Sequence, residues 1–318
     1  MSQGQIIIRF PFNDFMKYQD VNNMLPPQLI PLCNSVEVNE KDDRVAIRGS
    51  LIHEINNIID NVLSGVNPND IVFKNNIREY LNKINAKTYQ QYVDMLKNLN
   101  YSSEQHFAIL TYELLIRSMT DTFAIKGLDM PKDQKSLSDI YADICGEFAS
   151  FFIKDGDRDV KFLIKLLELC EKTFSDFVDQ KKPLDSNNMY RVDHFKGFMN
   201  LLGLLFSRGL LSHKITLSCA CKLKDLIFKS EWGQQECDNV FNGYKRMINQ
   251  ILTMHEKKYK EIDANSRAKS VEYLKSLQTI HNDIDNKNKE KPKLRKYTML
   301  AHKDMAERLH KIINVYNK

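Results

Sequence analysis

The chain has 318 residues, enough to bury a substantial core, and its 46 Lys and Arg against 41 Asp and Glu give a net charge of +5. So weak a positive field permits but does not demand a nucleic-acid partner. No basic leader with a long apolar core and no run of about eighteen apolar residues occurs, so we expect a cytoplasmic protein without membrane contact. The six cysteines form no CxxC pair, and we expect reduced, mostly buried thiols.

The first 45 residues differ from the rest in composition. They contain four of the eight prolines, which predicts an extended N-terminal arm over residues 1–45. The arm also contains many apolar residues, more than a free tail in water would keep exposed. We expect it either to lie against the helical body or to carry a partner-binding segment.

Residues 46–318 follow the helical period almost without interruption, and strand signals are few. Helices are predicted from near residues 51, 73, 87, 102, 135, 159, 192, 212, 234, 263 and 297. Pairs of helices at a spacing of roughly 40 residues are typical of the HEAT class of repeat. The predicted fold is therefore all-α: a HEAT-type α-solenoid of about five helical hairpins, formed by residues 46–318 behind the arm.

Local signals place several helix ends. In the stretch FMNLLGLLFSRGLLSHKIT, Gly209 is predicted to stop one helix in a left-handed conformation, and Ser212 to cap the next. Ser102 and Gln105 predict a capping box at another helix start. Lys-rich segments at residues 180–190 and 285–296 are predicted surface loops.

Known catalytic motifs are absent. The sequence has no Gly-rich phosphate loop, no dinucleotide fingerprint, no HExxH and no GxSxG, so no catalytic residue, cofactor or metal site is predicted. His281 and Asp285 stand one helical turn apart, and we interpret them as an ordinary pair on a solvated helix face. We therefore expect a protein that is not an enzyme.

Four segments carry a family resemblance. They are REYLNKINAKTYQQYVDMLKNL (Arg78 to Leu99), LSDIYADIC (Leu137 to Cys145), KFLIKLLELCEKTF (Lys161 to Phe174) and the stretch from Phe198 to Thr216. In this order they resemble the middle domain of eukaryotic translation initiation factor 4 gamma, over about residues 73–226. Gly203 matches a small residue of that family, where neighbouring helices would approach closely. The chain departs from the family pattern at Asn85, Ala86 and Leu137.

The resemblance implies a scaffold in translation initiation. Domains of that family bind a DEAD-box RNA helicase of the initiation factor 4A type and clamp its two RecA-like lobes. The family's helicase-binding segment corresponds to Leu81, Ile84 and Tyr89, with Arg78 and Lys83 as polar contacts. Leu81 and Ile84 are three residues apart, so they are equally interpreted as core residues that support this surface.

Two further contacts are implied. The densest basic run could attract RNA or an acidic partner through Lys287, Lys289, Lys291, Lys293, Arg295 and Lys296. The arm segment closest to the family's YxxxxLΦ motif for the cap-binding protein contains Tyr18, Met24 and Leu25, with the apolar pair one residue too late.

Two other functions stay open at the level of sequence. One is an adaptor of the same fold in nuclear mRNA processing or nonsense-mediated decay, because one fold serves several processes. The other is a helical RNA-binding protein without a helicase partner.

Overall fold

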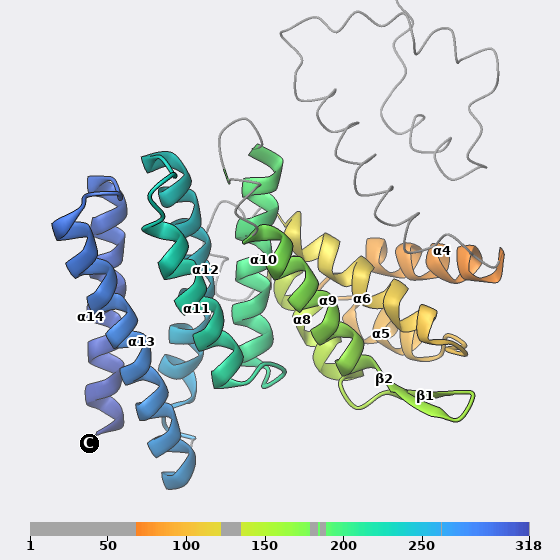
Figure 1. Cartoon of the computed structure of the whole chain (residues 1–318). Coiled ribbons are helices and arrows are strands. Elements are labelled where there is room, and N and C mark those ends of the chain that lie inside the picture. The colour runs from red at the N-terminus through yellow and green to blue at the C-terminus, as the bar shows by residue number, and fades with distance from the viewer. Residues whose placement is uncertain (1–67, 122–134, 179–183, 185–188, 262, 318) are drawn as a thin grey trace, which may run out of the picture. The chain divides into compact units, whose positions relative to one another are not determined.

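A computed structural model describes residues 68–121, 135–178, 184, 189–261 and 263–317 (Figure 1). The chain divides into two units, Met1–Gly65 and Val66–Lys318, and the following description concerns the second. The predicted arm, the boundary at residue 45 and the predicted helix from residue 51 lie outside the described residues, as does most of the predicted loop at 180–190.

Helices make up most of the described chain, as the sequence predicts. The ten helices within the described ranges are α4 (Pro68–Lys83), α5 (Tyr89–Lys97), α6 (Glu104–Met119), α8 (Leu137–Phe148), α9 (Phe162–Phe177), α10 (Met189–Ser207), α11 (His213–Ile227), α12 (Gln234–Lys258), α13 (Ala264–Glu290) and α14 (Lys296–Tyr316). None of them is long and apolar enough to cross a membrane. The all-α prediction is confirmed.

The helices pack in a solenoid-like succession (Figure 1). One row runs from α4 through α6, α10 and α12 to α14, each helix packing on the next. Beside this row, α8 packs on α6 and α10, α11 packs on α12 and α13, and α13 packs on α14. Core side chains therefore lie between successive helix pairs, and the HEAT repeat type stays a prediction.

Glycines permit close approach within the central row. A Cβ on Gly203 of α10 would lie 2.6 Å from the carbonyl oxygen of Met247 in α12. A Cβ on Gly197 would collide with the backbone of Met119 in α6, and one on Gly243 with the ring of Phe195. The predicted close packing at Gly203 is confirmed, and two further glycines serve the same contacts of α10.

The turn between α10 and α11 follows its sequence signals. Gly209 has φ of +76°, the left-handed conformation that glycine adopts without steric cost. The amide of Leu210 donates to the carbonyl oxygen of Leu205 at 3.0 Å, which closes the end of α10. The hydroxyl oxygen of Ser212 accepts from the amide of Ile215 at the start of α11. Both predictions for this turn are confirmed.

A β-hairpin replaces the end of the helix predicted from residue 135 and the start of the helix predicted from residue 159. α8 ends at Phe148, and β1 (Phe152–Asp155) then pairs antiparallel with β2 (Arg158–Lys161). Gly156 in the turn has φ of +61°. An Asp-Gly pair between short alternating segments favours a hairpin, and this signal overrides the helical period after Phe148.

The hairpin also corrects the predicted start of α6. The N-cap residue is Ser103, which makes no side-chain cap bond, so the capping box of Ser102 and Gln105 does not form. The carboxylate of Asp155 instead accepts a hydrogen bond from the amide of Glu104 at 3.0 Å. A residue distant in sequence thus satisfies an amide that a local side chain was expected to cap.

Two predictions about the C-terminal helices are wrong. α13 continues to Glu290, so only residues 291–295 of the predicted loop at 285–296 connect helices. His281 is not on a solvated face but is 1% exposed, because it points toward α12 and α14. Asp285 pairs instead with Lys289, one turn further along α13.

Candidate partner-binding surface

The turn between α4 and α5 is held by its own side chains. The side-chain oxygen of Asn85 accepts from the amides of Lys87, at 2.9 Å, and Thr88, at 3.2 Å. The hydroxyl of Thr88 donates to the carbonyl oxygen of Lys83 at 2.9 Å. Asn85, one of the departures from the family pattern, therefore organises the turn in the way an Asx turn does.

Two of the sequence-predicted contact residues lie beneath this turn. Leu81 is 1% exposed and Ile84 is 4% exposed. Both side chains belong to the core of the first helices, with Ile77, Val93 and Leu96 among the other buried residues of α4 and α5. In this arrangement they support the turn and are not available for contact with a partner.

The predicted polar residues have different settings. Lys83 is exposed and pairs with Glu79 one turn earlier, at 2.5 Å. The side chain of Arg78 is partly exposed, and its Nε donates a hydrogen bond to the carboxylate of Glu113 in α6 at 2.7 Å. Glu113 is buried and also lies 3.7 Å from Arg117, so two arginines neutralise one carboxylate. Arg78 thus both anchors α4 on α6 and presents part of its surface.

Tyr89 begins α5 and is partly buried. Burial raises the pKa of its hydroxyl well above the usual range, and the carboxylates of Asp143 and Glu147 in α8 add to the effect. Tyr89 therefore stays neutral at physiological pH. It lies between the α4–α5 turn and the polar face of α8.

That face of α8 is a row of ion pairs which the sequence did not predict. Asp139, Asp143 and Glu147 recur one turn apart. Arg208 at the end of α10 reaches both Asp139, at 3.1 Å, and Asp143, at 2.9 Å. Their four-residue spacing was the available signal, but the basic partners come from distant segments. Of the predicted contact residues, Tyr89 adjoins this row of balanced charges.

The basic run near residue 290 is divided between two roles. Lys293 donates to the carbonyl oxygen of Trp232 at 2.8 Å, and Arg295 pairs with the buried carboxylate of Asp238 at 3.1 Å. These two residues join the α13–α14 connection to the start of α12. The remaining four are exposed: Lys287, Lys289, Lys291 and Lys296. Lys287 also lies over the ring of Phe228, 5.7 Å from its centroid.

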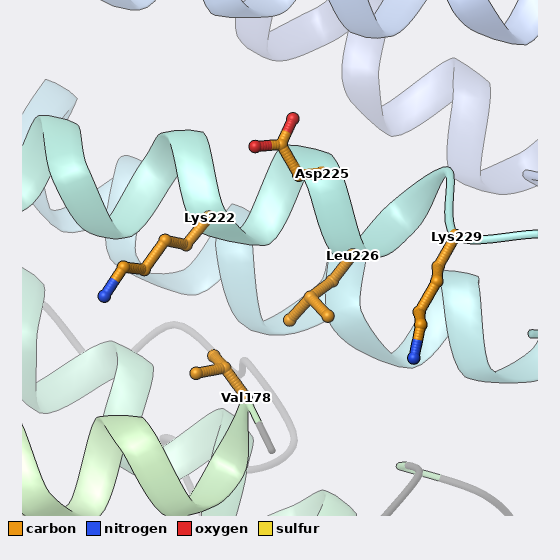
Figure 2. Close-up of a pocket in the computed structure, with 5 residues that line it drawn as sticks. All are labelled: Val178, Lys222, Asp225, Leu226 and Lys229. Atoms are coloured by element: carbon orange, nitrogen blue, oxygen red, sulfur yellow. The ribbon is translucent and has the colours of Figure 1, made fainter. Parts of the chain in front are cut away.

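A shallow pocket of 290 Å³ opens between the C-terminal ends of α9 and α11. Figure 2 shows Leu226 directed toward Val178, with the side chains of Lys222 and Lys229 on the same side of the helix and to either side of it. Asp225 points away from them. The two lysines lie over aromatic rings, Lys222 over Phe174 and Lys229 over Trp232. Lys222 and Lys229 give the pocket cationic edges.

Metal ligands do not converge in the part of the chain that is described: no three His, Cys, Asp or Glu side chains there could hold one ion. The predicted arm contacts Tyr18, Met24 and Leu25 lie outside the described residues. No family model matches the chain, and no curated protein matches it.

Proposed function

We propose that this chain is a scaffold in translation initiation that binds a DEAD-box RNA helicase of the initiation factor 4A type. The observation that carries the proposal is the α4–α5 turn. Its backbone is fixed by Asn85 and Thr88, its base is the buried pair Leu81 and Ile84, and it presents Lys83 to solvent. This turn is also the segment with the densest resemblance to the family's helicase-binding motif.

A preformed turn is suited to rigid recognition. Because its side chains are already hydrogen-bonded, binding orders few additional groups and loses little conformational entropy. Lys83, Lys87 and the exposed part of Arg78 supply positive charge that an acidic helicase surface would complement. The scaffold acts in the cytoplasm in this account.

The scaffold would act on the helicase without any catalytic group of its own. A protein that binds one arrangement of the two RecA-like lobes more tightly than the other shifts the population toward that arrangement by the difference in binding free energy. A HEAT-type stack suits this action because separate helix pairs can contact each lobe. The proposed effect is a higher ATP turnover by the helicase.

RNA contact is a second part of the proposal. The exposed cations Lys287, Lys289, Lys291 and Lys296 would attract phosphates without reading sequence, so the affinity would fall steeply with salt. Contact with the cap-binding protein through Tyr18, Met24 and Leu25 is tested separately, by titrating a peptide of residues 1–45 against that protein. Absence of saturable binding would end that part.

Binding variants test the helicase surface directly. The double charge reversal Lys83→Glu/Lys87→Glu changes exposed side chains only, and it should weaken binding to an initiation factor 4A type helicase at least about tenfold. The matched control is Lys269→Glu/Lys311→Glu, on exposed positions of α13 and α14. Equal affinities of the two variants would refute the proposed surface, and no binding of the wild-type chain would favour the adaptor function in mRNA processing.

A further inference from the structure

Two buried histidines meet where α13 packs against α14. His281 of α13 is 1% exposed and His302 of α14 is 3% exposed, and their ring centroids lie 4.9 Å apart. None of the four ring nitrogens makes a hydrogen bond of normal geometry. The ring of Tyr244 in α12 lies 5.5 Å from His281, and its buried hydroxyl is also unpartnered. The three helices therefore meet at polar groups that the fold leaves unsatisfied.

The charged groups around this pair do little to stabilise a protonated imidazole ring. The titratable groups that face it are Asp285 of α13, Lys303 of α14, Tyr244 of α12 and, beside Tyr244, Cys221 of α11. The carboxylate of Asp285 favours a charged His302, as does the backbone carbonyl of His281, while Lys303 opposes it. Asp285 is already paired with Lys289 at 2.5 Å. No carboxylate acts in the same way on His281.

The pair is therefore neutral while the helices are packed. Burial, and to a smaller degree the adjacent His302, lower the pKa of His281 to about 3. Burial also lowers the pKa of His302. When the helices separate and water reaches the rings, both pKa values return toward 6.5. The open state then binds more protons than the packed state, so packing loses stability as the pH falls below that value.

We propose that α13 and α14 form a proton-sensitive latch, in which protonation of the His281 and His302 pair releases this helical hairpin from α12 under mildly acidic conditions. At neutral pH the pair is a packed aromatic contact and the latch is closed. In mild acid the rings take up protons only when the helices separate, because two imidazolium groups held at this distance would repel each other and would be desolvated. If the chain clamps a helicase through separate helix pairs, opening removes one contact; this consequence alone rests on the proposed function.

Amide hydrogen exchange on the full chain tests the latch. Protection factors, corrected for the intrinsic effect of pH on exchange, are compared at pH 7.5 and pH 5.0. For a pKa near 3 in the packed state and 6.5 in the open state, His281 alone should raise the opening equilibrium of α13 and α14 about 30-fold at pH 5.0. Protection in α6 and α10 should change much less. An equal loss of amide protection in all helices at pH 5.0 would overturn the latch.

Two variants distinguish the effect of the His281 and His302 pair from the effects of other titrating groups. His281→Phe should reduce the acid-induced rise in the opening equilibrium of α13 and α14 at least tenfold. His310→Phe, at an exposed position of α14, is the matched control and should leave it unchanged. If His281→Phe does not fold, NMR titration of the wild-type imidazole provides the second test. A pKa of His281 near 6.5 in the folded chain, or an unchanged opening in the folded variant, would overturn the proposal.

Discussion

Gly203 of α10 lies directly against Met247 of α12: a Cβ on the glycine would be 2.6 Å from the methionine carbonyl oxygen and 2.7 Å from the Cβ of Gln250. These neighbours are backbone or near it, so they cannot rotate away. The spacing of the two central helices therefore depends on the absence of one methyl group.

Gly203→Ala should consequently destabilise the fold by about 1–3 kcal/mol, the usual cost of overpacking a filled core. The matched control is Gly146→Ala in α8, where a new Cβ would meet nothing within 4 Å. That change should raise the free energy of unfolding by up to about 1 kcal/mol, because alanine favours the helix. Denaturant titration of both variants measures whether each change lowers or raises the free energy of unfolding. A neutral or stabilising Gly203→Ala would contradict the close packing of α10 and α12.

Arg78 and Glu113 should be energetically coupled. Arg78→Leu leaves the buried Glu113 carboxylate with Arg117 alone, and we expect a loss of about 1–2 kcal/mol, reduced from the fully buried case because Arg78 is partly exposed. The double variant Arg78→Leu/Glu113→Leu should recover part of it, since no buried charge remains. A double-mutant cycle measures the coupling, and strictly additive losses would show that the pair contributes nothing.

Acid should weaken the packing at His255. Its Nδ1 lies 2.9 Å from the Tyr316 hydroxyl, and burial lowers its pKa to about 4, with a smaller effect from His213. The unfolded chain binds a proton near pH 6.5, so stability falls as the pH drops below that value, by about 2 kcal/mol at pH 5 for this residue. Unfolding titrations of wild type and His255→Leu at pH 7 and pH 5 should show the smaller loss in the variant. The exposed His310→Leu should behave as wild type.

Thiol reactivity should follow burial. Among the five described cysteines, all free, only Cys221 is exposed. Burial raises the pKa of Cys170 to about 12 and those of Cys219 and Cys237 to about 11, so these thiols carry little thiolate at neutral pH. Alkylation of the native chain followed by mass spectrometry should modify Cys221 well before the others. Fast modification of Cys170 would contradict its buried position.

The sequence predicted most helices because their signals are local. The end of α10 at Gly209 and the start of α11 at Ser212 depend on residues within one turn, and both are confirmed. The cap of α6 comes from Asp155, 51 residues from Glu104, so no local motif could reveal it. Sequence periodicity likewise could not show that His281 faces His302, because a third helix decides which polar residue is buried.

The candidate surface was predictable only in part. Resemblance placed Lys83 and Tyr89 near one turn, but it could not distinguish exposed from buried members of the same motif. Leu81 and Ile84 are buried, so their truncation to alanine would remove core contacts at about 2–5 kcal/mol each and confuse unfolding with lost binding. Exposed lysines are the cleaner probes.

The most direct test of the scaffold account is RNA-stimulated ATP hydrolysis by a purified initiation factor 4A type helicase, with and without the full chain. The account predicts a higher turnover with the wild-type chain and with Lys269→Glu/Lys311→Glu. It predicts a much smaller gain with Lys83→Glu/Lys87→Glu, checked for an intact helical fold by circular dichroism. A turnover that the wild-type chain leaves unchanged would contradict the account.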